Sequence, residues 1–396
     1  MTNDSGHQQS NSPPKVLWIV FLIAVALTTI VGLMRPRDFF AAWLAAILWP
    51  WSVCIGALTF RLIHVLTGGR WGAALFPWML ATIRRLPLVA FLFVPWALGL
   101  HWLYPWTDPQ TFAGIENVEH RQWFYQSGFV ILRTVGYFTL WSGLAVLSTG
   151  LPWPLRAVDW QTKPEVRPYP GGEGLAGLGL VAILLSVTWA AIDWIMSLDP
   201  FFMSTLFGAL VGMGALLSGM AMMVLSYCRH IGDQEPDDPK ALSDVANLLL
   251  AFVMLWAYLS FAQFLIMWQG DLPLEAAYFQ SRTYGLWNVV AVGLAVGGFA
   301  IPFACLMSRT FKKSPRMVAM LAACLLIVRL IELWWFVLPH SMETAARFNW
   351  AAIPAAVVVG CLWILLPGGP LITPASTPTQ MPNSDDSVAV EESHHD

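Results

Sequence analysis

The sequence predicts an all-α integral membrane protein with about ten transmembrane helices. Of its 396 residues, 57% are hydrophobic and only 11% are charged, whereas about a quarter of the residues in a soluble domain are charged. A net charge of −3 without a dense Lys/Arg block gives no indication of nucleic-acid binding. Many of the 22 tryptophans end apolar runs, as in a belt at the lipid headgroups: Trp49, Trp51, Trp102, Trp106, Trp153, Trp268, Trp334 and Trp335.

Ten apolar runs are long enough to cross about 30 Å of hydrocarbon, which takes roughly 20 residues. The first is too long for a secretory signal and lacks a small-residue cleavage site, so we expect it to be a helix of the mature chain. The second is long enough to include a re-entrant or tilted piece. The runs cover residues 15–34, 39–66, 84–104, 123–149, 175–196, 203–228, 244–268, 284–308, 316–338 and 348–366.

These runs predict one membrane domain over residues 15–366, because no loop between them is long enough for a soluble domain. Residues 1–14 are expected to form a disordered cytoplasmic tail. Residues 367–396 are rich in Pro, Ser and Thr and then acidic, which predicts a second disordered tail.

The basic residues of the loops predict the orientation, because cytoplasmic loops carry an excess of Lys and Arg. The odd-numbered loops hold few: Arg35, Arg37, Arg121, Arg282 and Arg347. The N-terminal tail and the even-numbered loops hold more: Lys15, Arg70, Arg84, Arg85, Arg156, Lys163, Arg167, Arg229, Lys240, Arg309, Lys312, Lys313 and Arg316. We therefore expect both termini in the cytoplasm.

A few charged residues fall within the predicted spans, where a charge costs about 2.5–3.5 kcal/mol and usually serves a function. Arg61, near the inner end of its helix, is expected to snorkel to the interface. Arg133 and Asp193 come from adjacent helices and could pair, with Tyr137 one turn from Arg133. Arg329 and Glu332 share a helical face. The predicted topology places all of these except Arg61 in the outer half of the membrane.

The seventh run carries a polar route toward this region, starting at Asp244 and Asn247 and continuing at Tyr258, Ser260 and Gln263. Acids, hydroxyls and amides can hold water and relay protons, but they also form the interhelical hydrogen bonds that fix packing in a bundle. Both interpretations stay open.

The sequence offers no ligand set for a redox cofactor. The five cysteines lie in or beside apolar runs without a CxxC motif, which speaks against zinc, iron–sulfur clusters and covalent haem. His64 and His101 are predicted at opposite faces of the membrane, so they could not ligate one haem iron together.

Three segments carry a resemblance to a known family. They are HVLTGGRWG at 64–72, DWIMSLDP at 193–200 with STLFG at 204–208, and NLLLAF at 247–252 followed by Trp256, Tyr258 and Gln263. With these motifs, most of residues 15–366 resembles the F-type membrane subunit of alternative complex III, a bacterial quinol:cytochrome c oxidoreductase. The chain departs from the family pattern at Phe201, where the family has a histidine, which puts in doubt a proton exit or quinone contact at that position.

The resemblance implies two four-helix bundles, helices two to five and six to nine, plus two flanking helices, as in NrfD/polysulfide-reductase membrane subunits. It implies a subunit of the bacterial inner membrane that is not catalytic alone, binds no redox cofactor of its own, and supports a proton path and assembly. The implied partners are a homologous C-type membrane subunit, an iron–sulfur subunit related to molybdoenzymes, and multihaem and monohaem cytochromes c, which hold the haem and iron–sulfur groups. The candidates for a proton path or quinone site are Arg133, Tyr137, Asp193, Asp199, Arg329, Glu332, Asp244, Tyr258, Gln263 and His64.

Two other functions are compatible with the sequence. A quinol-binding NrfD-like subunit of another redox complex would need a pocket with hydrogen-bonding groups, which Arg133, Tyr137 and Asp193, or His101 and Tyr104, could supply. A secondary transporter usually has broken helices at matching places in its two halves, a pattern that the prolines of this chain do not form.

Overall fold

The computed structural model describes residues 15–112, 123–149, 172–232, 239–270, 273–341 and 348–365. Within these ranges every regular element is a helix, and nine helices are long and apolar enough to cross a membrane. The chain is therefore an all-α multi-pass membrane protein, as the sequence predicts. The two predicted tails, 1–14 and 367–396, lie outside the described residues.

The membrane-spanning helices follow the predicted runs, with one displaced. They are α1 (Lys15–Met34), α2 (Pro36–Thr67), α3 with α4 (Arg70–Ile83, Leu86–Leu98), α7 (Ser127–Thr149), α8 (Gly172–Trp194), α9 (Phe207–Ile231), α10 (Pro239–Gly270), α12 with η4 and α13 (Leu286–Ala295, Val296–Ala300, Ile301–Met307), and α15 (Pro315–Val337). A tenth apolar helix, α16 (Ala352–Leu365), has 14 residues, so its length of about 21 Å falls short of the hydrocarbon thickness.

Short helices connect the spans. They are α5 (Leu100–Leu103), η1 (Pro105–Thr107), η2 (Pro109–Phe112), η3 (Met196–Leu198), α11 (Pro273–Thr283), α14 (Arg309–Lys312) and η5 (Leu338–Ser341). The element η4 is a π-helical turn inside the eighth span, a feature that is frequent at functional sites.

The third span corrects the prediction, because it begins at Arg70 and not at residue 84. Arg84 and Arg85, which were predicted to lie in a loop, form the turn between α3 and α4 inside this span. Arg85 is buried, donates to the carbonyl of Trp363 on α16 and lies over that indole ring.

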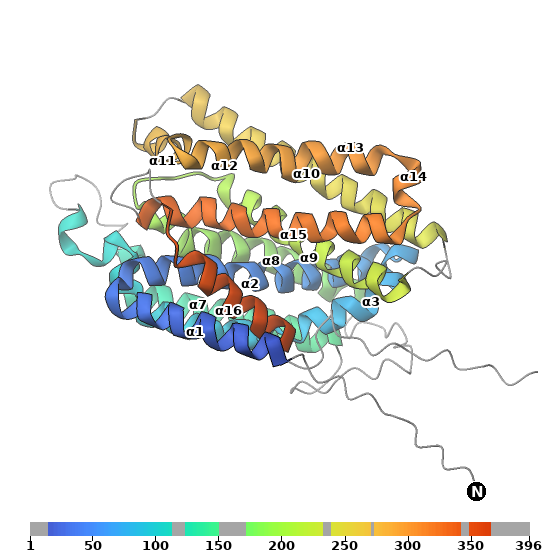
Figure 1. The fold of residues 1–396 in the computed structure, drawn as a ribbon, viewed down its shortest axis with the longest axis horizontal. Coiled ribbons are helices and arrows are strands. Elements are labelled where there is room, and N and C mark those ends of the chain that lie inside the picture. Colours follow the sequence, from blue (N-terminus) through green and yellow to red (C-terminus); the bar gives the residue numbers. More distant parts are fainter. Residues whose placement is uncertain are drawn as a thin grey trace, which may run out of the picture.

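The helices form two groups around a central pair. α2, α3–α4, α7 and α8 pack as one group, and α9, α10, α12–α13 and α15 pack as the other, with α2 against α9 as the largest contact. Figure 1 shows α1 and α16 side by side along one edge and α10, α12 and α13 along the opposite edge. The start of α1, the end of α16 and α14 lie at one end of the bundle, termed the Lys15 end, and α11 lies at the other, termed the α11 end.

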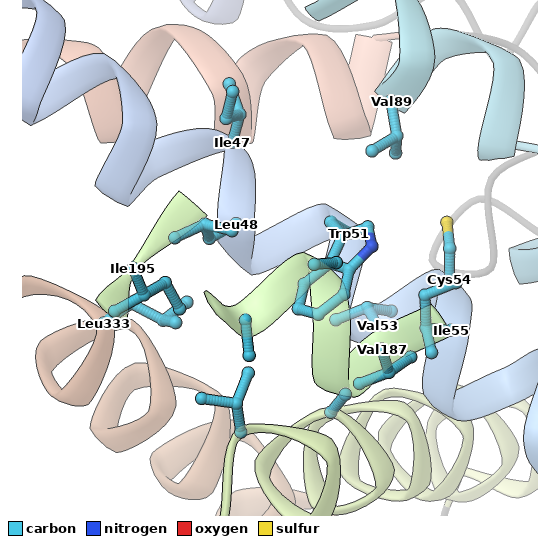
Figure 2. Close-up of a cluster of buried hydrophobic side chains, with 14 of the residues drawn as sticks. Ile47, Leu48, Trp51, Val53, Cys54, Ile55, Val89, Val187, Ile195 and Leu333 are labelled. Carbon is cyan, nitrogen blue, oxygen red and sulfur yellow. The ribbon is translucent and has the colours of Figure 1, made fainter. Parts of the chain in front are cut away.

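The core is built around α2. This helix begins with Pro36 and Asp38 in its first turn and stops at Gly68, whose φ of 61° suits a glycine at a helix end. It is one continuous helix of 32 residues, so the re-entrant piece that its length suggested is not found. Figure 2 shows side chains of α2, among them Trp51, surrounded by residues of α4, α8 and α15.

The tryptophans divide between this core and the surface. Trp102 and Trp268 are exposed, as a belt requires, but Trp51 and Trp106 are buried. The Trp51 and Trp194 rings meet edge to face with their centroids 5.3 Å apart. The predicted belt is therefore wrong for Trp51 and Trp106, because an aromatic ring at the end of an apolar run also fills space between helices.

Candidate functional site

The first charged site, termed the Asp193 cluster, joins Asp193, Arg133 and Tyr137. Asp193 is the penultimate residue of α8 and has no exposed surface. Arg133 of α7 donates to it twice, from Nε to Oδ2 at 2.9 Å and from Nη2 to Oδ1 at 2.6 Å. The Tyr137 hydroxyl donates to Oδ2 at 2.8 Å. Arg133 thus binds the carboxylate in a bidentate, charge-assisted arrangement, which is stronger than a hydrogen bond between neutral groups.

The guanidinium of Arg133 has further contacts, although its Nη1 has no hydrogen-bond partner among the described residues. Its Nη2 donates to the carbonyl of Phe124 at 3.0 Å, and the guanidinium lies 4.0 Å and 4.4 Å from the ring centroids of Phe124 and Phe129. These contacts add to those of Asp193 in holding the cation. The pairing of Arg133 with Asp193 that adjacency and depth predicted is observed.

The second charged site, termed the Glu332 cluster, lies in the other group of helices. Arg329 and Glu332 of α15 form an ion pair one turn apart, and both are buried. Trp256 of α10 donates from Nε1 to Oε1 of Glu332 at 2.9 Å, and Arg329 Nε donates to Ser218 of α9 at 3.4 Å. Gly214 lies against the guanidinium, where a Cβ would collide with it.

The polar route on α10 divides into two separate groups. At the Lys15 end, Asp244 pairs with Arg70 at 3.2 Å, and Asn247 accepts from Lys312 at 2.6 Å. Tyr258 lies farther along, with 66% of its surface exposed. The ten residues of α10 between Asn247 and Tyr258 are apolar apart from an indole N–H. They separate the two groups by about 16 Å of helix, so α10 does not supply a continuous side-chain relay.

The remaining candidates have local roles in the structure. Asp199 accepts from the backbone N–H of Phe201 at 3.2 Å and closes the turn after η3. His64 is buried, with its ring 5.5 Å from that of Trp71 and Gly72 packed beneath it. Arg61 is also buried, 5.1 Å from the Phe76 ring centroid, so the expected snorkelling is wrong. A large planar cation at this depth is stabilised by aromatic faces of the protein interior.

Sequence reasoning missed a third set of contacts, at α11. Arg282 is buried and donates to the carbonyls of Trp335 and Phe336 at 3.1 Å and 2.7 Å, which are among the free carbonyls at the end of α15. The Tyr278 ring stacks on Phe202 at 3.9 Å. Burial raises the pKa of Tyr278 and lowers that of Arg282. A single arginine in a predicted outer loop was the only sequence signal for this connection.

A cavity of about 800 Å³ lies among α9, α10, α11, α12 and α15. Two predicted candidates, Gln263 and Glu332, line it, and so does the exposed Tyr258. Gln263 is 2% exposed and accepts from Ser204 at 2.7 Å through Oε1. The Asp193 cluster does not border this cavity, and neither do His101 and Tyr104.

The described part of the chain has no group of three or more His, Cys, Asp and Glu residues that could hold a metal ion. Comparison with known proteins adds no relative: no family model matches the chain, and no curated protein matches it.

Proposed function

We propose that this chain is a membrane subunit of a bacterial respiratory quinol:cytochrome c oxidoreductase of the alternative complex III type. In this proposal it lies in the inner membrane with both termini in the cytoplasm, binds no haem or iron–sulfur group, and supports a proton path. Its partners would be a homologous C-type subunit, an iron–sulfur subunit and cytochromes c. The three sequence motifs around Gly68, Asp193 and Asn247 support this assignment.

The proposed proton path is supported by the Asp193 carboxylate. This group is fully buried and accepts two hydrogen bonds from Arg133 and one from Tyr137. An ionisable residue inside a span is costly and usually belongs to an ion pathway. Asp193 accepts two hydrogen bonds at Oδ2 and one at Oδ1, which leaves a lone-pair position on Oδ1 where a proton could bind. Protonation would remove the charge that holds the Arg133 guanidinium, so proton uptake at Asp193 would weaken this contact, as a relay site requires.

The test is Asp193→Asn in the intact complex, reconstituted in vesicles. The amide keeps the size of the side chain and removes the ionisable group, but it leaves the Arg133 cation without its counter-ion. We therefore expect a less stable complex that still assembles, with fewer protons moved per electron. Asp108→Asn, the same change at an exposed residue of the α11 end, should leave the ratio unchanged. An unaltered proton-to-electron ratio in Asp193→Asn would exclude this role.

A further inference from the structure

The cavity among α9, α10, α11, α12 and α15 has polar groups that the charged clusters do not use. α10 presents Trp256, Ser260 and Gln263 to it, at i, i+4 and i+7, which is one face of a helix. Trp256 is held by Glu332 and Gln263 by Ser204. The inner face of α10 therefore has a polar stripe along the cavity, in which hydrogen bonds hold Trp256 and Gln263 in place.

Three atoms of the cavity lining have no hydrogen-bond partner among the described groups of the protein: Gln263 Nε2 and Ser260 Oγ of α10, and the Tyr278 hydroxyl of α11. Gln263 and Tyr278 are almost completely buried. Buried polar atoms ordinarily have partners, and each exception calls for an explanation. One amide nitrogen and two hydroxyls that line the same cavity match a ligand that accepts hydrogen bonds.

The rest of the lining indicates a flat, neutral ligand. Aromatic rings dominate the wall, including Phe207, Phe279, Trp335 and Phe336, and Glu332 is the single charged side chain among the described residues that line it. Because Arg329 already pairs with Glu332 and no Lys or Arg lines the described wall, a phosphate headgroup would find no cation. An aromatic-lined cavity with few hydrogen-bonding groups suits a planar ring.

The cavity is also accessible from the lipid-facing side of the bundle. Tyr258, Phe261 and Phe264 line it and are exposed on α10, which lies with α12 along an outer edge of the molecule (Figure 1). On the other side of the cavity, the π-helical turn of η4 places Gly298 against the Trp256 ring. A Cβ added to Gly298 would lie 2.7 Å from the nearest atom of that ring. The turn thus leaves space for the indole that holds Glu332.

We infer that this cavity binds the ring of a lipid-soluble quinone. The Gln263 amide and the Ser260 and Tyr278 hydroxyls would donate to the ring oxygens, and the apolar tail would leave between α10 and α12. The inference deepens the proposed function and rests on it for the membrane redox setting, but it concerns a different site from the Asp193 cluster.

The test is photolabelling of the purified full-length chain in nanodiscs with a short-chain azidoquinone. We expect crosslinks on α10 and α12, competition by unlabelled quinone and no competition by decanol. Gln263→Leu should raise the half-saturating quinone concentration about tenfold, as for the loss of one hydrogen bond in a buried site. Gln269→Leu, the same change at an exposed residue of α10 that does not line the cavity, should leave it unchanged.

A second variant keeps the test decisive if Gln263→Leu does not fold. Ser260→Ala removes only a hydroxyl and should also weaken labelling. Equal competition by decanol would identify a crevice for acyl chains and overturn the inference, as would crosslinks at the Asp193 cluster. Specific labelling combined with a normal proton ratio in Asp193→Asn would retain the quinone site and remove the proposed proton path. Co-purification with respiratory partners, without specific labelling by the azidoquinone, would retain the proposed respiratory assignment and exclude the quinone site in this cavity.

Discussion

At the scale of single residues, the buried carboxylates of the two clusters are each held by side chains of another helix. Asp193 receives its three hydrogen bonds from α7, and Glu332 receives one from α10 in addition to its ion pair with Arg329. A buried pair stabilises a protein little compared with an apolar substitute, but removing one partner leaves a charge that nothing compensates. The two clusters are therefore points at which single substitutions have large effects.

Arg133→Leu tests this for the Asp193 cluster. The variant leaves a carboxylate without exposed surface and with only the Tyr137 bond, so the free energy of unfolding should fall by about 3–5 kcal/mol. The measurement is denaturant unfolding of the chain in mixed micelles. Arg35→Leu removes an exposed ion pair with Asp38 and should change the free energy by less than about 1 kcal/mol.

A double variant separates charge from packing. Arg133→Leu combined with Asp193→Leu removes both charges and should recover part of the lost stability. If Arg133→Leu and Arg35→Leu lowered stability equally, the Asp193 carboxylate would have to be compensated in another way.

The sequence predicts part of these sites for physical reasons. Arg133 and Asp193 stand at similar depth on consecutive helices, and consecutive helices usually lie side by side, so their pairing follows. The contact of Trp256 with Glu332 joins helices 76 positions apart. Nothing in the local pattern of either helix shows which face of α10 turns toward α15, so this contact was not predicted.

At the scale of elements, the packing of α2 against α9 depends on two glycines. A Cβ on Gly56 would meet the Cα of Gly219 at 2.9 Å, and one on Gly219 would meet the backbone of Gly56 at 2.6 Å. Small residues let helix backbones approach in this way inside a membrane protein. The central contact between the two helix groups is therefore a backbone contact that a single methyl group would disturb.

Gly56→Ala should lower the free energy of unfolding by about 1–3 kcal/mol, since the added methyl group overpacks the interface. Gly136→Ala is the matched control, because Gly136 is inside α7 with open space around its Cα. That variant should be neutral or gain up to about 1 kcal/mol, because alanine is the better helix former. The pair can be compared by unfolding in increasing sodium dodecyl sulfate. If Gly56→Ala and Gly136→Ala changed the free energy of unfolding equally, α2 and α9 would be able to separate slightly without a loss of stability.

Helix positions were predictable to the extent that apolar length sets them. A run of about 20 apolar residues leaves few alternatives, and most spans begin and end within a few residues of the prediction. The third span was displaced because Arg84 and Arg85 interrupt the run. Arg85 is accommodated by the carbonyl and ring of Trp363, 278 positions away, and such a tertiary partner is invisible in the local sequence.

At the scale of the whole molecule, the orientation stays a prediction. Moving Arg84 and Arg85 from a loop into the third span reduces the excess of basic residues at the Lys15 end without reversing it. The cavity and both charged clusters lie toward the opposite end, because α8 finishes at Trp194, α15 at Val337, and α11 packs against the end of α15. With that orientation they lie in the outer half of the membrane.

The proposed function predicts what the chain assembles with. In that proposal, the haem and iron–sulfur groups that transfer electrons are held by partner subunits. A tagged chain purified from its native membrane in mild detergent should therefore retain an iron–sulfur subunit, c-type cytochromes and a homologous ten-helix protein. The visible spectrum of the purified material should show the haem bands of those cytochromes. A colourless chain obtained alone, under conditions that keep other respiratory complexes intact, would contradict the respiratory assignment and would direct attention to transport, with the buried ion pairs as substrate ligands.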